Sequence, residues 1–534
     1  PRAVVVFAQT LWSVPLSARA AFFRLSRVCP GRRLVGTISQ LTPMMRQYHD
    51  AKAACGDALL FFRMGDFYEL FLDDAKIAAE ILGLTLTSRD KDSDNPTAMA
   101  GFPHHQLDAY LHKLIKAGFR AAVCEQVEDH KLAKGLVKRE ITRVVRAGTL
   151  TDEWLLDPRE ENYVAAVCLH RDQRGAKQDA EPRVGIAWAE LSSGRFEAGT
   201  FAQSRIEDEL ARIGPADVIY REDDVHFTPD TTAPWAWTGR PAWTFAEDSS
   251  RDTLCKQFSV HNLEGFGFTD HDAPAIRAAG AVLTYLQETQ RGDLDHFRSL
   301  SAHHRTAFVQ IDAATRRSLE ITRTLRSGSR EGSLLGVLDL TCTPLGSRLL
   351  ADWVAAPLID RQAIEDRLDA VEELFNDGQL RSDVRQPLKQ TFDLTRLLSR
   401  VATGRTGPRD LQQIARTLAN LPKLKARLTD RKPERLTFIQ AHLHLCPELR
   451  GQFEAALADE CPITASDGNF IRAGFDEQLD SLRELARGGK EWIAAYQRGQ
   501  MDETGIQNLK VGYNKVFGYY LEVTNAQRDR VPES

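Results

Sequence analysis

The sequence contains no run of about 18 apolar residues, so no transmembrane helix and no membrane partner are predicted. Its eight cysteines are scattered, with neither Cys-x-x-Cys pairs nor Cys/His spacing of the kind that holds a metal. Such thiols are typical of a reduced, cytosolic protein. The chain also lacks an excess of positive charge, since 69 Lys and Arg face 74 Asp and Glu. Any contact with a polyanion must therefore come from local patches.

Acidic side chains and lysine are both absent from residues 1–49, which contain seven arginines, and the first methionine is Met44. An Arg-rich, acid-free composition is typical of an organellar transit peptide, and Val4–Ala8 has some character of a secretory signal. We favour a third interpretation, upstream sequence from a truncated or mis-started gene, because it also explains the missing methionine. Residues 1–39 are thus a non-native or targeting-like extension and are left out of the fold prediction.

The remaining length and composition predict several domains. At 534 residues with 43% hydrophobic and 27% charged side chains, roughly three to five domains are expected. We predict a small mixed α/β domain at 40–152 and an α/β domain at 160–280, where strand-like segments precede a helix and another strand. A long helical domain follows at 281–470, and a helix with a β-hairpin at 471–534. We interpret 281–470 as structural support without chemistry.

Local signals predict where several elements begin and end. Thr42 is a plausible helix cap with Pro43 at the first helical position. Acidic side chains open a second helix that ends at Gly83, and a third ends at Gly118. In 281–470, prolines such as Pro422 punctuate the helices.

The most informative segment combines a turn signal, an aromatic ring and a carboxylate: Gly65-Asp66-Phe67-Tyr68-Glu69-Leu70-Phe71. If it is extended after the turn, Phe67 and Glu69 share one face and Tyr68 and Leu70 the other. A flat ring beside an acceptor suits base inspection, because the ring can wedge into a stack while the carboxylate meets a base edge. Taken alone, the segment is more typical of a core strand with one glutamate at its edge.

Two other groups of side chains have a functional alternative. Six basic residues stand between Lys131 and Arg146 against one acid, which fits a solvated edge or a surface that faces phosphates. His105, Asp108 and His112 recur on one side of a predicted helix. They have no fixed fourth ligand, so no metal site is predicted.

Several segments taken together resemble the MutS family of DNA mismatch repair proteins, from about Thr42 to the last residue. The stretches that carry the resemblance are Phe61-Phe62-Arg63-Met64-Gly65-Asp66-Phe67-Tyr68-Glu69-Leu70-Phe71, Met99-Ala100-Gly101-Phe102-Pro103-His104-His105, Cys124-Glu125-Gln126, Asp312-Ala313-Ala314-Thr315-Arg316-Arg317-Ser318-Leu319-Glu320, Thr343-Pro344-Leu345-Gly346-Ser347-Arg348 and Val511-Gly512-Tyr513-Asn514-Lys515-Val516-Phe517-Gly518-Tyr519-Tyr520. The resemblance implies a mismatch-binding domain at 40–152 and a ribonuclease H-like connector at 160–280. It further implies a helical core and lever domain at 281–470 and an incomplete clamp at 471–534.

The resemblance also implies roles for individual residues. Phe67 would stack on a mispaired or unpaired base from the minor groove, and Glu69 would hydrogen-bond that base. Gly65, Asp66 and Tyr68 would support them. The implied partner is double-stranded DNA with mismatches or small loops. In the hairpin, Lys510 and Lys515 are positioned to touch the DNA backbone.

One departure concerns the ATPase domain, through which the family dimerises. No Gly-x4-Gly-Lys-Ser/Thr motif occurs, and Gly488-Gly489-Lys490-Glu491 is the nearest match. We therefore expect an incomplete copy without catalytic activity or cofactor, with ATP and Mg²⁺ bound by the missing part of the parent. The resemblance further implies a homodimeric parent, a downstream factor of the MutL type and a cytoplasmic, nucleoid-associated location.

Three alternatives remain beside mismatch recognition. A relative specialised for recombination junctions would lack the Phe67–Glu69 pair. A metal-dependent nuclease would need several converging carboxylates, whereas Glu190 is the only obvious one on a predicted strand. A non-catalytic helical DNA-binding scaffold would explain 281–470 but leaves Gly65–Phe71 without a purpose.

Overall fold

The structure is a computed structural model that describes residues 42–56, 58–88, 96–128, 137–150, 155–170, 182–225, 227–230, 233–290, 294–303, 307–514, 518–524 and 531. The chain divides into two compact units. One runs up to Thr406 and takes in Asn420–His444, and the other combines Gly407–Ala419 with the chain from Leu445 onward. Residues 1–39 lie outside the described part, so their predicted character is not tested. The described helices include none with both the length and the apolar character that a bilayer crossing requires.

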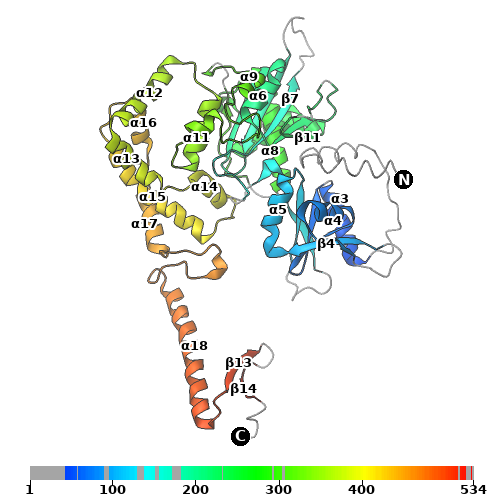
Figure 1. Ribbon diagram of the computed structural model, residues 1–534, viewed down its shortest axis with the longest axis vertical. Helices are drawn as coiled ribbons and strands as arrows, with labels where there is room; N and C mark the ends of the chain where they lie inside the picture. The colour runs from blue at the N-terminus through cyan, green and yellow to red at the C-terminus, as the bar shows by residue number, and fades with distance from the viewer. Residues whose placement is uncertain are drawn as a thin grey trace. The chain divides into compact units, whose positions relative to one another are not determined.

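The first domain is a sheet between helices (Figure 1). Its described elements are α3 (Pro43–Cys55), β1 (Leu59–Met64), β2 (Phe67–Phe71), α4 (Leu72–Leu82), β3 (Thr87–Ser88), β4 (Ala98–Pro103), α5 (Leu107–Lys116), β5 (Ala121–Gln126) and β6 (Arg139–Val145). The strand order is β3-β4-β2-β1-β5-β6. Strands β1 and β5 run parallel, whereas β2 is antiparallel to both β1 and β4. Strand β2 therefore lies inside the sheet.

Alternation along β1 builds two separate cores in this domain. Leu59 and Phe61 pack with α4 and α5, whereas Leu60 and Phe62 pack with α3 on the opposite face. Such two-sided burial explains why β1 is a continuous apolar run rather than an alternating one.

In the first domain, the predicted start of α3 and the predicted end of α4 are confirmed. The Thr42 hydroxyl accepts from the Met45 amide and Pro43 begins α3. Helix α4 ends at Gly83, which has φ 72°, in the left-handed region that glycine adopts without strain.

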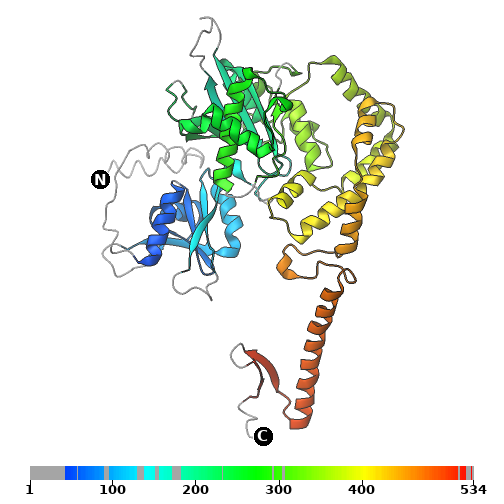
Figure 2. The same cartoon turned by 180° about the vertical axis from the view of Figure 1, so that it is seen from behind.

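The second domain is another sheet covered on both faces. Its described elements are β7 (Tyr163–His170), β8 (Arg183–Glu190), β9 (Arg195–Ala202), α6 (Ile206–Ile213), β10 (Asp217–Arg221), β11 (Ala236–Arg240), α7 (Glu247–Phe258), α8 (Ala273–Gln290) and β12 (Ser301–Ala302). The strand order is β11-β10-β7-β8-β9-β12. Helices α7 and α8 pack on one face and α6 on the other. Figure 2 shows α8 lying along the sheet.

The elements of this domain continue past residue 280, where we predicted that the helical domain would begin. Helix α8 runs unbroken to Gln290 and supplies much of the core, and β12 pairs with β9. The close fit depends on Gly185 in β8, because a Cβ there would lie 1.9 Å from the Pro274 carbonyl oxygen. The apolar pattern of residues 273–290 predicts a buried helix, but it does not show which domain that helix packs against.

Helices dominate the chain after Ala313. The described helices up to His442 are α9 (Ala313–Ser318), α10 (Leu334–Leu338), α11 (Pro344–Ala355), α12 (Arg361–Asn376), α13 (Gly378–Leu388), α14 (Leu394–Ala402), α15 (Pro408–Leu428) and α16 (Glu434–His442). Several begin at an aspartate whose carboxylate accepts from a backbone amide, as at Asp360 and Asp393. Pro422 lies inside α15 instead of ending a helix, contrary to the prediction.

The second unit carries the predicted helix and hairpin. Its further elements are α17 (Pro447–Ala456), α18 (Glu477–Thr504), β13 (Lys510–Asn514) and β14 (Gly518–Glu522). Helix α18 begins after Phe475, with Asp476 as its cap, and continues through Gly488 and Gly489. A glycine in a helix costs only about 1 kcal/mol relative to alanine, which does not end a long helix. The predicted fold class, mixed α/β domains followed by a helical region, is confirmed.

Candidate functional site

The turn between β1 and β2 presents an aromatic ring to solvent. Gly65 has φ 59°, a left-handed conformation that few side chains tolerate, and it allows the tight reversal before Phe67. Phe67 is the first residue of β2, pairs with Met64 across the hairpin, and is 46% exposed. Most large aromatic side chains of this domain are buried, so an exposed ring at the end of an inner strand needs a reason other than packing.

Strand alternation places Phe67 and Glu69 on one face of β2 and Tyr68 and Leu70 on the other. Tyr68 and Leu70 are buried among the residues that face α4 and α5, whereas Glu69 remains partly exposed. Opposite Glu69 on β4 stands Gly101. A Cβ at Gly101 would lie 3.3 Å from Glu69 Cγ and 3.0 Å from the Tyr68 carbonyl oxygen. Glycine therefore leaves room for the Glu69 side chain on the face that also carries Phe67.

The turn is held by His104, the residue that follows β4. The His104 amide donates to the Asp66 carbonyl at 2.8 Å, and His104 Nδ1 lies 3.1 Å from the same oxygen. The Asp66 side chain is itself 90% exposed. The turn backbone is thus fixed while its carboxylate extends into solvent beside Phe67.

A group of polar side chains lies under the hairpin. The Tyr68 hydroxyl donates to Glu125 Oε1 at the end of β5, and Glu125 Oε2 lies 3.8 Å from Arg63 Nη1. The Arg63 guanidinium lies 5.5 Å from the centre of the Tyr68 ring, and its Nε donates to the Gly65 carbonyl. Burial, followed by the hydrogen bond to Glu125, raises the pKa of Tyr68, so its hydroxyl remains a donor at physiological pH.

Sequence reasoning missed Arg63, Gly101 and Glu125 as parts of this site. All three lie in segments that carry the family resemblance, but each belongs to a different strand from Phe67. No periodic pattern links residues that meet only through strand pairing.

The basic segment has a mixed structural role. Lys138 is exposed and pairs with Glu140 at 2.6 Å. Arg139 points into the protein, because its Nε donates to the Arg63 carbonyl at 2.7 Å. Arg146 donates to Thr238 Oγ1 at 2.6 Å in the second domain. Lys131 and Lys134 lie outside the described residues. The interpretation of one continuous solvated or phosphate-facing edge is therefore wrong for Arg139 and Arg146.

The remaining candidates receive no further support from geometry. His105 lies in the 3-10 turn His104–Gln106, and Asp108 and His112 lie in α5. No group of three metal-ligating side chains is found within the described part of the chain. Lys510 is exposed at the start of β13, whereas Lys515 lies outside the described residues.

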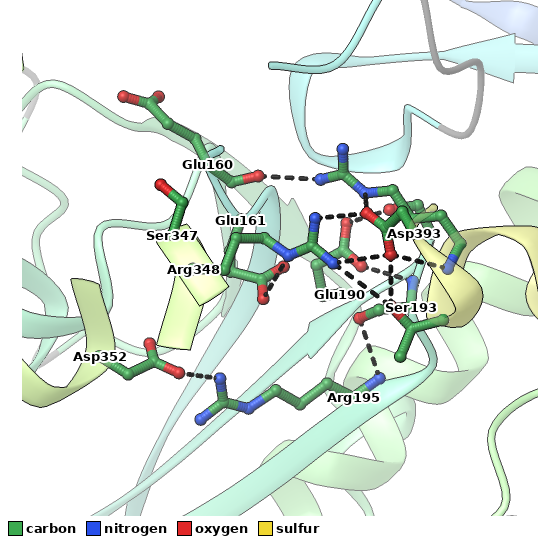
Figure 3. A network of polar contacts seen from close by, with 12 residues as sticks. Glu160, Glu161, Glu190, Ser193, Arg195, Ser347, Arg348, Asp352 and Asp393 are labelled. Carbon is green, nitrogen blue, oxygen red and sulfur yellow. Dashed lines mark hydrogen bonds and ion pairs between the residues drawn. The ribbon is translucent and has the colours of Figure 1, made fainter. Parts of the chain in front are cut away.

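A second polar network joins the start of the second domain to the helices α11 and α14, as Figure 3 shows. Arg348 in α11 donates to both carboxylate oxygens of Asp393, at 2.6 and 3.0 Å. The Arg348 Nε lies 3.2 Å from Oε1 of Glu161, a residue that precedes β7 in the chain. Nearby, Arg195 at the start of β9 pairs with Asp352 of α11.

Burial and charge shift the protonation of this network in opposite directions. Burial, reinforced by Glu190, raises the pKa of Glu161 to about 7 although Arg348 lies beside it. Burial would also raise the pKa of Asp393, but the hydrogen bonds and charge of Arg348 outweigh it and hold that pKa below its usual range. These ion pairs connect the second domain to the helical region, which is a structural role for α11 and α14.

Comparison with known proteins identifies the domains. Models of one family match three consecutive stretches: MutS domain I over residues 42–154, MutS domain II over 162–298 and MutS domain III over 314–526. The DNA mismatch repair protein MutS of Rhodopirellula baltica is 70% identical over 502 residues, which are 92% of this chain and 56% of that protein. The protein of the same name from Salinibacter ruber is 41% identical over 495 residues, 92% of this chain and 54% of that protein. The chain thus spans about half the length of the curated relatives it matches.

Proposed function

Because this chain belongs to the MutS family, we propose that its first domain recognises mispaired or unpaired bases in duplex DNA to initiate mismatch repair. The observation that carries the proposal is the exposed Phe67 ring, which a tight turn places beside Glu69 on one face of an inner strand. These side chains lie within the stretch that matches MutS domain I.

In the proposed mechanism the ring acts as a wedge. Phe67 enters the base stack from the minor groove and unstacks one step, which costs a few kcal/mol on paired DNA. A mismatch has already lost part of that stacking and pairing, so the same kink is cheaper there. Discrimination then follows largely from the deformability of the DNA.

Glu69 would supply the polar half of the contact. Its carboxylate accepts a hydrogen bond from the displaced base. On correctly paired DNA it finds no donor and is repelled by phosphates, which penalises the wrong partner. Gly65, Asp66 and Tyr68 would support the two contact residues, and Lys510 and Lys515 would contact the DNA backbone.

Family membership alone supports the remaining proposals for the whole protein. We expect a homodimer that acts with a downstream factor of the MutL type in the cytoplasm, associated with the nucleoid. ATP and Mg²⁺ would bind outside this chain, whose 534 residues contain no Gly-x4-Gly-Lys-Ser/Thr loop.

The decisive experiment replaces Phe67 by alanine. Fluorescence anisotropy would measure binding of the full chain to a G·T duplex, a duplex with one unpaired T, and the matched homoduplex. Because a base stacked on an aromatic ring is worth about 1–3 kcal/mol, Phe67→Ala should reduce the preference for the lesion by roughly 5- to 150-fold. Its affinity for homoduplex should change little, since backbone contacts provide that affinity.

A matched control is Phe375→Ala, which removes another exposed ring, on α12, far along the chain from the turn. It should leave both affinities unchanged. Equal discrimination by Phe67→Ala and the unmodified chain would refute the proposed function.

A further inference from the structure

If the direction of the Phe67 ring is set before DNA binds, less conformational entropy is lost when the ring is inserted. Phe67 is the first residue after the turn and is 46% exposed, so packing around the ring itself restricts its direction only in part. Ordering a loose turn during insertion would weaken the lesion complex, where the ring is inserted, more than the homoduplex complex, where it is not.

Three side chains join the turn to the core of the sheet. Tyr68, directly after Phe67, is 1% exposed and donates its hydroxyl to Glu125. Glu125 lies near the Arg63 guanidinium, which also lies over the Tyr68 ring and donates to the Gly65 carbonyl inside the turn. The contacts therefore form a closed circuit that includes the turn, β1, β2 and β5.

The circuit is anchored from β6 as well. Arg139 donates to the Arg63 carbonyl at 2.7 Å and to Gln47 Oε1 at 3.1 Å. With its amide in the orientation that satisfies both neighbours, Gln126 accepts from Arg139 Nη2 at 3.2 Å and from the Gly65 amide at 3.3 Å. In this orientation, the backbone N–H and the carbonyl of Gly65 both contact side chains.

We propose that Arg63, Tyr68 and Glu125 form a brace that fixes the direction of the Phe67 ring and thereby sets how well lesions are told apart from paired DNA. The inference rests on the proposed function of Phe67. It makes Tyr68 and Glu125 positioning residues, which act through the turn without contacting DNA. Partial burial strengthens the brace, because charged contacts screened from water hold their geometry better than exposed ones.

The test removes the Tyr68 hydroxyl and keeps the ring, as Tyr68→Phe. Losing an ordered turn should reduce the preference for the G·T duplex roughly two- to tenfold and leave homoduplex affinity unchanged. Glu125→Gln keeps an acceptor for the Tyr68 hydroxyl, so it should retain more discrimination than Glu125→Ala.

A matched control is Tyr48→Phe. The Tyr48 hydroxyl is also buried in the first domain, where it donates to the Phe71 carbonyl at 3.2 Å on the opposite face of the sheet. Its removal should lower the unfolding midpoint about as much as Tyr68→Phe does, without changing discrimination. If both variants reduce discrimination equally, general destabilisation explains the effect and the brace is refuted.

A spectroscopic measurement follows the ring directly. With 4-trifluoromethylphenylalanine at position 67, the ¹⁹F resonance of the free chain should be a single line displaced from that of the free amino acid. In Tyr68→Phe it should move toward the free amino acid, while Tyr48→Phe leaves it in place. An unchanged resonance in Tyr68→Phe would overturn the proposal.

A double-mutant cycle separates the brace from the proposed function. In the Phe67→Ala background, Tyr68→Phe should cause no further loss of discrimination. If Phe67→Ala alone has no effect, the proposed function fails. If Phe67→Ala abolishes discrimination but Tyr68→Phe retains it fully, only the brace fails, and an additional loss in the double mutant would also refute it.

Discussion

Replacing Arg348 by methionine would leave buried carboxylates without their cation. The guanidinium is 4% exposed, and its partners Asp393 and Glu161 are 10% and 13% exposed. It also donates to the Pro158 carbonyl at 2.9 Å. Methionine fills most of the same volume, so the perturbation is chiefly electrostatic.

The loss of stability in Arg348→Met depends on which carboxylate can lose its buried charge by taking up a proton. Breaking a buried ion pair by removing one partner costs about 3–5 kcal/mol. Glu161 contributes little of that, because its pKa is already raised to about 7 and it protonates readily. Asp393 contributes most, since Arg348 holds its pKa below the usual range. The loss should therefore be largest at pH 8 and shrink toward pH 5, where both carboxyls can be neutral.

Urea denaturation followed by far-UV circular dichroism at pH 8, 6.5 and 5 would measure this loss as a free energy, and a thermal melt at pH 8 would measure it as a change in Tm. At about 2–4 °C per kcal/mol, Tm at pH 8 should fall by roughly 6–20 °C. Hydrogen exchange should localise the weakening to the segment before β7 and to α11 and α14. A matched control is Arg361→Met on α12, whose exposed pair with Glu365 is worth at most about 0.5 kcal/mol.

A loss below about 1 kcal/mol at pH 8, or one equal to that of Arg361→Met, would show that Arg348 does not stabilise this junction. A loss of stability that is independent of pH would mean that Arg348 stabilises the junction by packing, and it would refute the argument that protonation of Asp393 and Glu161 reduces the loss.

Three other perturbations have defined outcomes. Glu161→Gln should flatten the dependence of unfolding free energy on pH: the raised pKa means that the folded carboxyl stabilises the protein when protonated and loses that contribution as pH rises from about 4.5 to about 7. The difference, about 3 kcal/mol, can be read from urea titrations, and an unchanged slope would contradict it. Glu69→Gln should strengthen homoduplex binding about two- to fivefold by removing repulsion from phosphates, and an anisotropy titration with no such gain would count against its proposed role. Gly185→Ala should destabilise the second domain by about 3 kcal/mol or more because its Cβ would meet the Pro274 backbone, whereas Gly265→Ala, with open space around it, should be neutral in the same melt.

The local architecture of the first domain could be predicted because short-range signals carry it. The Gly65-Asp66 turn, the alternation that exposes Phe67 and buries Tyr68, and the helix end at Gly83 each depend on a few neighbouring residues. The identity and spacing of neighbouring residues are enough to predict a structure that depends only on short-range interactions.

The polar networks could not be predicted because they join residues far apart in the chain. Glu161 and Arg348 meet across 187 positions, and Tyr68 meets Glu125 across 57. On their own helices, arginines such as Arg348 resemble the solvated residues of an exposed face. Nothing local shows that the helix turns that face toward another domain.

The inner position of β2 has a consequence for what this surface can accept. A contact residue on a free loop can adjust to each lesion, whereas β2 is bonded on one side to β1 and on the other to β4, so the backbone that carries Phe67 is fixed on both sides. If Phe67 is the wedge, the DNA must supply all of the movement. The lesions that are bound would then be determined by the flexibility of the DNA rather than by the chemical identity of the bases. A mismatch in stiff DNA should bind weakly, and a flexible but correctly paired step should be the commonest site of false binding.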